Sequence, residues 1–178
     1  MKRIFFIFSA ITLLLVSCNV KEGSVKEVLV DEINSYEKVL IDSVNFDLNT
    51  DTAKLLIVKY KDFVKQYGKD SLSPIYLLKA ADLCISTKDY STAVELYENV
   101  YTNYPDYDKT PQALFLQAMT YSDFLKNESL GEIKYQEFIN KYPNHELTDD
   151  AKKSIEFLGK SPEEILEILQ AKDSLSNN

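Results

Sequence analysis

Residues 97–105 read YENVYTNYP, and the same ending occurs as YKDFVKQYG at residues 60–68 and as YQEFINKYP at residues 135–143. Each copy has a tyrosine, an apolar residue and a second tyrosine at the same spacing. The final tyrosines Tyr67, Tyr104 and Tyr142 lie 37 and then 38 residues apart. Self-similarity at such a period is typical of stacked helical hairpins. The sequence therefore predicts an all-α solenoid of about three hairpins followed by a terminal helix.

The composition is that of a single helical domain. The chain has 178 residues, 45% of them hydrophobic and 27% charged, which is enough apolar material to bury a core. Only four glycines and five prolines are present, and this favours long helices over many tight turns. The formal net charge is -8, and the single arginine is Arg3. Because such an acidic chain is repelled by phosphate backbones, we expect no nucleic-acid partner.

Capping residues and hydrophobic periodicity predict the helix boundaries. Ser24 and Glu27 have the spacing of a capping box and open an amphipathic helix. Gly68 is expected to end the second helix in a left-handed conformation, and Gly159 to end a later one. The helices predicted after the first are 52–67, 73–86, 91–103, 110–124, a partner helix ending before Pro143, 148–158 and 161–171. They form a predicted domain at 24–171, followed by a flexible tail at 172–178.

The N-terminus has the pattern of a secretory leader. Residues 1–18 read MKRIFFIFSAITLLLVSC, with a basic start and an apolar run that is too short to span a bilayer comfortably. The sequence predicts a signal peptide at residues 1–17. An uncleaved membrane anchor and an ordinary leader followed by a chance cysteine are the alternatives.

The last four residues of this stretch, LVSC at 15–18, resemble the bacterial lipobox. The resemblance implies cleavage before Cys18, which would carry a diacylglycerol and further acyl chains such as palmitate. A lipidated tether at residues 18–23 would then connect the membrane to the first helix. By resemblance to lipoprotein sorting rules, Asn19 favours the outer membrane, with the periplasmic face as the expected side. The sequence leaves the surface leaflet open.

Small residues and aromatic residues recur at matching positions before Pro105 and Pro143. In the first of these units the residues are Ala81, Ala93 and Tyr97. The corresponding residues of the second unit are Ala118, Met119, Gly131, Tyr135 and Phe138. The pattern resembles the tetratricopeptide repeat, whose usual period is about 34 residues. The resemblance implies that the small residues let two helices cross closely and that the aromatic residue fills the gap beside them. We expect the extra residues of this chain in the loops at 106–109 and 144–148.

The Tyr-Pro ending is similar to that of repeats in bacterial outer-membrane lipoproteins of the barrel-assembly and cell-division coordinator types. This resemblance implies a non-enzymatic scaffold that binds proteins, and more specifically a subunit of an envelope machine such as the one that assembles outer-membrane proteins. Two alternatives are a coordinating lipoprotein associated with the cell wall or division and a surface-exposed accessory to nutrient uptake.

The sequence offers little for catalysis or for binding of metals and cofactors. Its one histidine, His145, lies in a predicted loop without a patterned nucleophile nearby, so we expect a surface or loop-packing role. Cys84 lies among apolar residues and is expected to be a small core residue. Neither a paired-cysteine or paired-histidine metal motif nor a glycine-rich phosphate loop is present. We therefore predict that the chain is not an enzyme and needs no cofactor.

The predicted binding surface is the groove that the first helices of successive repeats line in tetratricopeptide arrays. By that resemblance the groove residues are Leu78, Asp82, Ile85, Leu116, Thr120 and Asp123. Their alternative role is packing between repeats for the apolar residues and solvation for the aspartates. Lys79 is the only basic residue of 75–86, and 111–124 has none, so a clamp for a carboxylate is disfavoured. A basic, apolar or β-strand-bearing protein segment is the expected partner.

Overall fold

The computed structural model describes residues 22–41 and 47–176, most of which are helical. The helices are α1 (Glu22–Lys38), α2 (Thr50–Tyr67), α3 (Leu72–Ser86), α4 (Tyr90–Asn103), α5 (Thr110–Met119), the π-helix η1 (Thr120–Phe124), α6 (Glu128–Lys141), α7 (Thr148–Phe157) and α8 (Pro162–Ser176). No helix among the described residues combines the length and hydropathy needed to cross a membrane. The predicted signal peptide and Cys18 lie outside the described residues.

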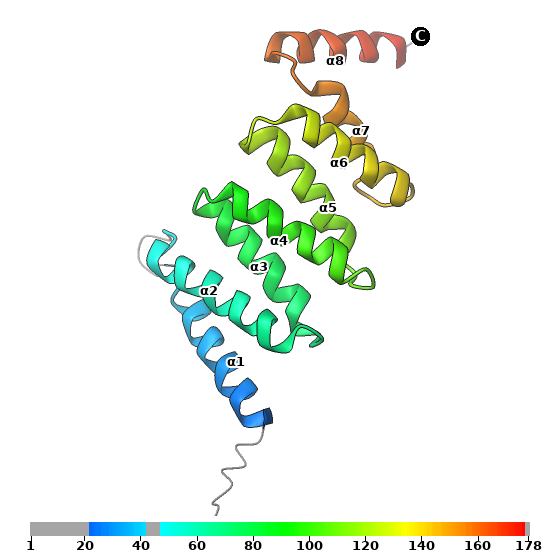
Figure 1. Cartoon of the computed structure of the whole chain (residues 1–178). Helices are drawn as coiled ribbons and strands as arrows, with labels where there is room; N and C mark the ends of the chain where they lie inside the picture. Colours follow the sequence, from blue (N-terminus) through cyan, green and yellow to red (C-terminus); the bar gives the residue numbers. More distant parts are fainter. Residues whose placement is uncertain (1–21, 42–46, 177–178) are drawn as a thin grey trace, which may run out of the picture.

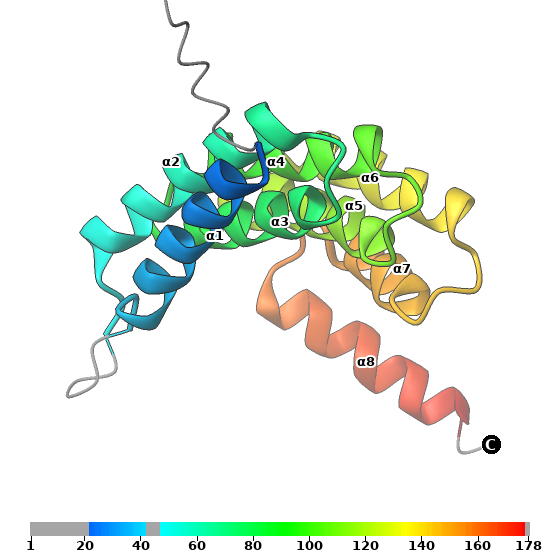
Figure 2. The same ribbon diagram turned by 90° about the horizontal axis from the view of Figure 1, so that it is seen from below.

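The helices pair into hairpins that stack in a row (Figure 1). Helix α1 packs on α2, α3 on α4, and α5 on α6, while α2, α4 and α6 each contact the first helix of the next hairpin. Figure 2 shows α2, α4 and α6 in one layer and α1, α3, α5 and α7 in the other, on the inner side of a shallow arch. The predicted all-α solenoid of about three hairpins is therefore confirmed, with α7 and α8 following it.

The core is built from the tyrosines and apolar residues of the repeated ending. These residues come from α2, α4 and α6, and each is at most 2% exposed: Tyr60, Phe63, Tyr97, Val100, Tyr135 and Phe138. Tyr60 stacks on Tyr76 of α3 with ring centroids 5.0 Å apart, and Phe63 meets the same ring edge-on. The aromatic rings of α2 therefore also join the first hairpin to the second. Such contacts are stabilising because aromatic side chains bury large apolar surfaces.

Small residues allow the two helices of a hairpin to approach closely, as predicted. Ala81, Ala93 and Ala118 are fully buried. A Cβ atom added to Gly131 would lie 2.8 Å from the Cβ of Ser122, closer than real Cβ atoms approach. Gly131 is therefore required for packing of α6 on η1, although glycine lowers helix propensity by about 1 kcal/mol.

The loops between hairpins share a buried hydroxyl group. It donates a hydrogen bond to the carbonyl oxygen of the final tyrosine, six residues earlier: Ser73 Oγ to Tyr67 at 2.7 Å, Thr110 Oγ1 to Tyr104 at 2.5 Å and Thr148 Oγ1 to Tyr142 at 2.7 Å. The hydroxyl-bearing residues are at most 4% exposed. Each bond satisfies a carbonyl at the end of a helix, where backbone groups lose their helical partners. The repeat of the sequence is thus a repeat of loop geometry as well.

The turns within the second and third hairpins are also alike. Lys88 and Lys126 have positive φ angles of 64° and 54°, which a lysine seldom adopts. The next residue caps the following helix: Asp89 accepts a hydrogen bond from the Thr92 amide, and Asn127 from the Leu130 amide. A left-handed residue followed by a capping side chain therefore reverses the chain at each of these turns.

The single π-helical turn explains why the two intervals between the final tyrosines differ. Thr110 precedes Lys126 by one residue more than Ser73 precedes Lys88, whereas the other equivalent segments have equal lengths. In η1 the Leu125 amide donates to the Thr120 carbonyl, five residues back, at 3.0 Å. A π turn accommodates one extra residue within a helix. The longer second interval is therefore an insertion in the inner helix, while the two loops at 105–109 and 143–147 have the same length.

Several predicted boundaries need correction. Helix α1 begins at Glu22, so Ser24 lies inside it and does not open it; the expected tether at 18–23 overlaps the helix. Helix α2 begins at Thr50, because Asn49 caps it by accepting from the Thr52 amide at 3.0 Å.

Helix α8 begins with the predicted capping box, in which Ser161 and Glu164 exchange hydrogen bonds. It continues to Ser176, beyond the expected end at 171.

The predicted left-handed conformation of Gly68 is wrong. Its φ angle is -56°, in the right-handed region, whereas Gly159 has the expected positive value of 70°. After Gly68 the chain turns through hydrogen bonds from the Asp70 amide to Tyr67 and from the Ser73 amide to Asp70, so no left-handed residue is needed. The Tyr104 hydroxyl donates to the Gly68 carbonyl at 2.8 Å. The backbone of Gly68 thus contributes to the contact between the loops that follow α2 and α4.

Candidate partner-binding surface

The predicted groove residues all lie on α3, α5 or η1, which belong to the inner layer (Figure 2). Asp82 and Asp123 are exposed, and Ile85 and Leu116 are half-buried against the core. Leu78 is only 8% exposed. Thr120 needs correction, because it is fully buried and its hydroxyl donates to the Leu116 carbonyl at 2.7 Å within the helix. The inner surface therefore presents the two aspartates, with Ile85 and Leu116 partly accessible between them.

Asp82 lies at a cleft near the N-terminal end of the row. This N-terminal cleft has a volume of about 330 Å³ and is lined by Glu37, Leu40, Tyr60, Lys79, Asp82 and Leu83. The Tyr97 hydroxyl donates to Asp82 Oδ1 at 2.9 Å. Although the residue as a whole is exposed, partial burial of the carboxylate raises the pKa of Asp82, against the lowering effects of Tyr97 and Lys109. No ion pair to Asp82 is found among the described residues.

Glu37 holds the other carboxylate of the N-terminal cleft. The Tyr60 hydroxyl donates to Glu37 Oε1 at 2.6 Å, and Lys79 Nζ lies 2.8 Å from the same oxygen. Burial raises the pKa of Glu37, but the hydrogen bonds from Lys79 and Tyr60 outweigh it and give a net lowering. Lys79, the one lysine of α3, therefore forms an ion pair with a carboxylate of α1. Sequence reasoning missed Glu37 because contact between α1 and α3 depends on how two hairpins pack.

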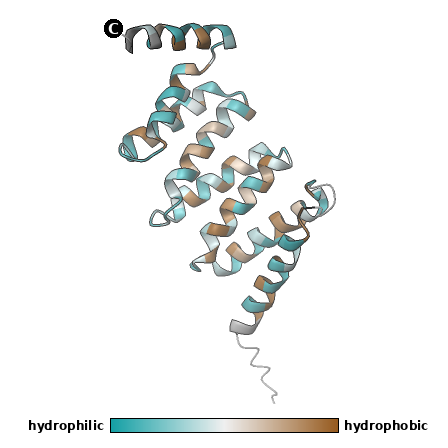
Figure 3. Cartoon of the chain, turned by 180° about the vertical axis from the view of Figure 1, so that it is seen from behind, coloured by the Kyte–Doolittle hydropathy of each residue, from teal (hydrophilic) through white to brown (hydrophobic). Residues whose placement is uncertain are grey.

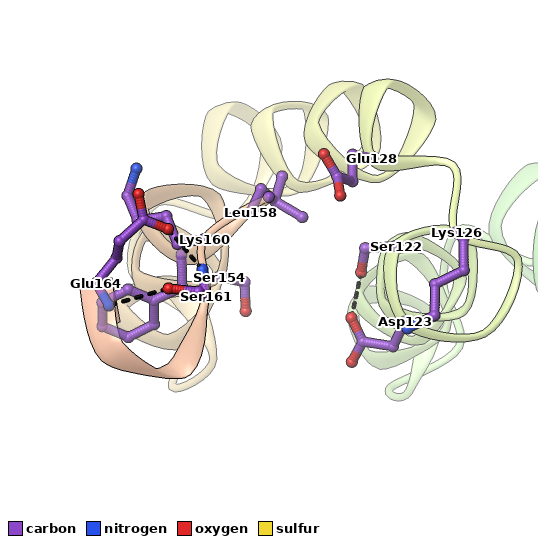
Figure 4. Close-up of a pocket in the computed structure, with 11 residues that line it drawn as sticks. Ser122, Asp123, Lys126, Glu128, Ser154, Leu158, Lys160, Ser161 and Glu164 are labelled. Atoms are coloured by element: carbon purple, nitrogen blue, oxygen red, sulfur yellow. Dashed lines mark hydrogen bonds between the residues drawn. The ribbon is translucent and has the colours of Figure 1, made fainter. Parts of the chain in front are cut away.

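Asp123 lies at a second, larger cleft at the other end of the row (Figure 4). This C-terminal cleft has a volume of about 670 Å³ and separates the turn after η1 from the linker between α7 and α8. Figure 4 shows Ser122, Asp123 and Lys126 on one side of it, with Lys160 and Glu164 on the other. The Ser122 hydroxyl donates to Asp123 Oδ1 at 2.6 Å. The lining carries charges of both signs and hydroxyl groups, a composition suited to a polar segment of a partner.

Helix α8 stands apart from the stacked hairpins in both views (Figures 1 and 2). An ion pair between Lys172 and Glu156 of α7, at 2.6 Å, connects it to the solenoid. Leu166 and Leu169 are 55% and 45% exposed. Hydrophobic and hydrophilic residues alternate along this helix, as they do along α1 (Figure 3). The helix thus borders the C-terminal cleft at its first turn and leaves part of its apolar face in solvent.

The residues considered for reactive chemistry have structural roles. The Nδ1 atom of His145 accepts a hydrogen bond from the Leu147 amide at 3.2 Å, and its ring meets Phe138 edge-on, which is the predicted loop-packing role. Cys84 is a buried core residue, as predicted, and burial raises the pKa of its thiol to about 11. Such a thiol is protonated at neutral pH and is a poor nucleophile. Within residues 22–41 and 47–176, no three histidine, cysteine or acidic side chains converge on a metal site.

Comparison with known proteins identifies one of the hairpins. Residues 112–145 match the family model described as a tetratricopeptide repeat. A search of curated proteins gave no match. The matched residues span α5, η1 and α6, and they include the small residues, the buried tyrosine and the Tyr-Pro ending described above. This chain therefore carries a tetratricopeptide repeat at residues 112–145, within an all-helical solenoid of similar hairpins.

Proposed function

We propose that this chain is a lipid-anchored scaffold that binds another protein through the inner layer of its solenoid. Tetratricopeptide repeats generally mediate binding between proteins, and stacked repeats present extended surfaces for this purpose. The observation that carries the proposal is the position of Asp82 and Asp123. Each is exposed on an inner helix, and each borders a separate cleft.

The membrane attachment is proposed from the sequence. The LVSC stretch at 15–18 supports lipidation of Cys18, and the outer membrane, at its periplasmic face, is the proposed location. Helix α1 begins at Glu22, so a Cys18 anchor would hold the solenoid within a few residues of the membrane surface. Metabolic labelling with a palmitate analogue tests this: label is expected on the wild-type chain and none on Cys18→Ser. Equal labelling of both would overturn lipidation at Cys18.

Within this class, the specific proposal is a subunit of an envelope machine, with assembly of outer-membrane proteins as the first assignment. It is supported by the Tyr-Pro ending at Pro105 and Pro143, which resembles that of repeats in lipoproteins of that kind. The test is crosslinking in intact cells, purification of the tagged chain from detergent extract, and mass spectrometry. A barrel insertase at near-stoichiometric yield is expected. Recovery of cell-wall or division proteins without an insertase would overturn the assembly assignment and retain the scaffold.

A variant with Asp82→Asn and Asp123→Asn tests whether the inner layer is the binding surface. Its yield of crosslinked partner should fall, because both changes remove a negative charge from the proposed binding surface. Asparagine keeps the size of the side chain, so the fold should be unaffected. The matched control is Asp106→Asn with Asp108→Asn, two exposed residues of the loop between α4 and α5. An equal yield from both variants would place the partner on another face of the solenoid.

A further inference from the structure

The two carboxylates of the N-terminal cleft differ in how they are paired. Glu37 shares one oxygen with the Lys79 ammonium and the Tyr60 hydroxyl, so its charge is neutralised locally. Asp82 has only the neutral hydroxyl of Tyr97, bound to Oδ1, and its Oδ2 has no hydrogen bond to the described residues. Lys109 acts on Asp82 electrostatically but forms no ion pair with it, so the cleft contains one carboxylate without an ion-pair partner among the described residues. A partly desolvated carboxylate in this state gains most from a cationic partner.

The remaining lining of the cleft is apolar. Leu40 follows α1 and packs half-buried on the core, and Leu83 of α3 is 8% exposed. Together with Tyr60 they line a space of about 330 Å³. This volume is at the lower end for small-ligand sites, so it suits a single long side chain better than a large molecule. Lysine and arginine have the matching shape, an aliphatic stem and a charged head.

We propose that the N-terminal cleft binds a lysine or arginine side chain of the partner protein. The charged head would pair with Asp82, and the aliphatic stem would lie against Leu40 and Leu83. This inference rests on the proposed scaffold function and gives its partner a chemistry, a segment with an exposed cationic residue. An anionic residue is disfavoured because Lys79, the one cation of the cleft, is already bound to Glu37.

Peptide titration of the full chain in neutral detergent, with ¹³C-labelled leucine methyl groups, tests the proposal. The probes are three acetylated and amidated pentapeptides with alanine at the flanking positions and lysine, arginine or norleucine at the centre. Norleucine keeps an aliphatic stem and lacks the charge. We expect saturable shifts of the Leu40 and Leu83 methyl signals with lysine or arginine, and binding about tenfold weaker with norleucine. Equal binding of norleucine, or no saturable shift with either cationic peptide, would overturn the proposal.

Two variants assign the charge dependence to one residue. Asp82→Asn retains the side-chain shape and the oxygen that accepts from Tyr97, and it should weaken binding of the cationic peptides about tenfold while leaving norleucine binding unchanged. Asp106→Asn, at an exposed residue of the loop between α4 and α5, is the matched control and should change neither. Unchanged lysine and arginine binding by Asp82→Asn would contradict the inference.

The peptide titration tests the N-terminal cleft, and partner capture in cells tests the scaffold function, so the two proposals can fail separately. If peptide binding depends on Asp82 and no partner is captured in cells, the cleft assignment stands and the envelope role fails. If a partner is captured equally by the wild-type chain and by Asp82→Asn, and the peptides do not bind, the scaffold stands and the cleft assignment fails.

Discussion

The Thr110 hydroxyl donates a hydrogen bond of 2.5 Å to the carbonyl oxygen of Tyr104, and a serine or threonine makes the same bond to a tyrosine carbonyl after α2 and after α6. Thr110 is 1% exposed, so water cannot replace the hydroxyl. The bond fixes the path of the loop between the end of one outer helix and the start of the next inner helix. Repetition of this contact gives successive hairpins the same relative orientation.

Replacement of Thr110 by valine should therefore destabilise the fold. The change keeps the shape but removes a buried donor from the Tyr104 carbonyl, which then accepts only from the Tyr107 amide at 3.1 Å, and we expect the free energy of unfolding to fall by about 1 kcal/mol. Thr102→Val is the control, because Thr102 is exposed and its hydroxyl contact to Glu98 is 3.3 Å long. Urea denaturation should show a change below about 0.5 kcal/mol for the control. An equal decrease in the free energy of unfolding for the two variants would show that the buried hydrogen bond of Thr110 contributes no more to stability than the exposed contact of Thr102.

Lys88→Gly should stabilise the chain. Lys88 has a φ angle of 64°, which costs a side-chain-bearing residue about 1–2 kcal/mol, whereas glycine adopts it freely. After the entropic cost of glycine, a net gain of about 1 kcal/mol is expected. Lys109→Gly is the contrasting control: its φ angle is -95°, so the same change should lower stability by about 0.5–1 kcal/mol. Denaturation curves that shift in the same direction for both variants would contradict this account of the turn.

Gly131→Ala should lower stability although alanine favours helix. The gain of about 1 kcal/mol in propensity is opposed by overpacking, since the new Cβ would lie 2.8 Å from the Ser122 Cβ and 3.2 Å from its backbone nitrogen. We expect a net loss of about 1–2 kcal/mol in thermal or urea unfolding. Gly68→Ala provides the comparison, because its φ angle is -56° and its nearest neighbour would be the Val64 carbonyl oxygen at 3.1 Å. A larger loss at Gly68 would refute close packing of α6 on η1.

Deletion of Asp123 should be tolerated because it removes the extra residue that the π turn accommodates. The amide of Leu125 would then bond to a carbonyl four residues back, and the downstream contacts would keep their register. Deletion of Ser86 from α3, which has no π turn, rotates all following residues and should unfold the hairpin or leave a much lower melting temperature. Circular dichroism melts compare the two. The expectation would be contradicted if the Ser86 deletion melted cooperatively near the wild-type temperature and the Asp123 deletion did not.

The two carboxylates of the N-terminal cleft should give opposite pH effects. Glu37 has a lowered pKa in the folded chain, so its stabilising effect is present above its unfolded value of 4.5 and is lost as the pH falls through the folded value. Glu37→Gln should therefore lower stability at pH 7 and reduce the loss on acidification. Asp82 has a raised pKa, so its charge is unfavourable at neutral pH. Asp82→Asn should raise stability at pH 7, and this gain should disappear as the pH falls through the folded pKa of Asp82.

Urea midpoints measured from pH 7 to pH 3 test both directions with one method. The amide variants remove the same carboxylate chemistry from neighbouring positions, so each serves as the control of the other. If both variants are more stable at pH 7, the favourable effect of Lys79 and Tyr60 on the Glu37 charge is contradicted; if both are less stable, the unfavourable burial of the Asp82 charge is contradicted. The stabilised Asp82→Asn chain is also well suited to the peptide titration, because weaker binding could not be ascribed to unfolding.

Much of the fold could be predicted from the sequence because its signals are local and repeated. The tyrosine spacing predicts the hairpin period, and Tyr60, Tyr97 and Tyr135 are buried in equivalent positions. The capping box at Ser161 and the end of a helix at Gly159 depend on neighbouring residues, and both are observed. The prediction for Gly68 is wrong because the chain after it turns through hydrogen bonds of the Asp70 and Ser73 amides, which need no left-handed residue. A glycine after a helix does not by itself distinguish this turn from a left-handed cap.

The candidate binding surface was only partly accessible to sequence reasoning. Asp82 and Asp123 were assigned to inner helices, and they are exposed there. Thr120 was assigned to the groove by register, but the π turn that begins at this residue shifts the register, and Thr120 is buried. Glu37 was missed because α1 and α3 belong to different hairpins.

The sequence by itself determined the helical hairpins, their number and the identity of the core residues, because these follow from spacing along one chain. Only the tertiary structure decided which charges are paired. Lys79 could have neutralised Asp82, three residues away on the same helix, yet it binds Glu37 of α1 at 2.8 Å. That choice depends on the angle at which one hairpin packs on the next, since a change of a few ångströms would break an ion pair. Because Lys79 pairs with Glu37, Asp82 is the carboxylate of the N-terminal cleft without an ion-pair partner among the described residues.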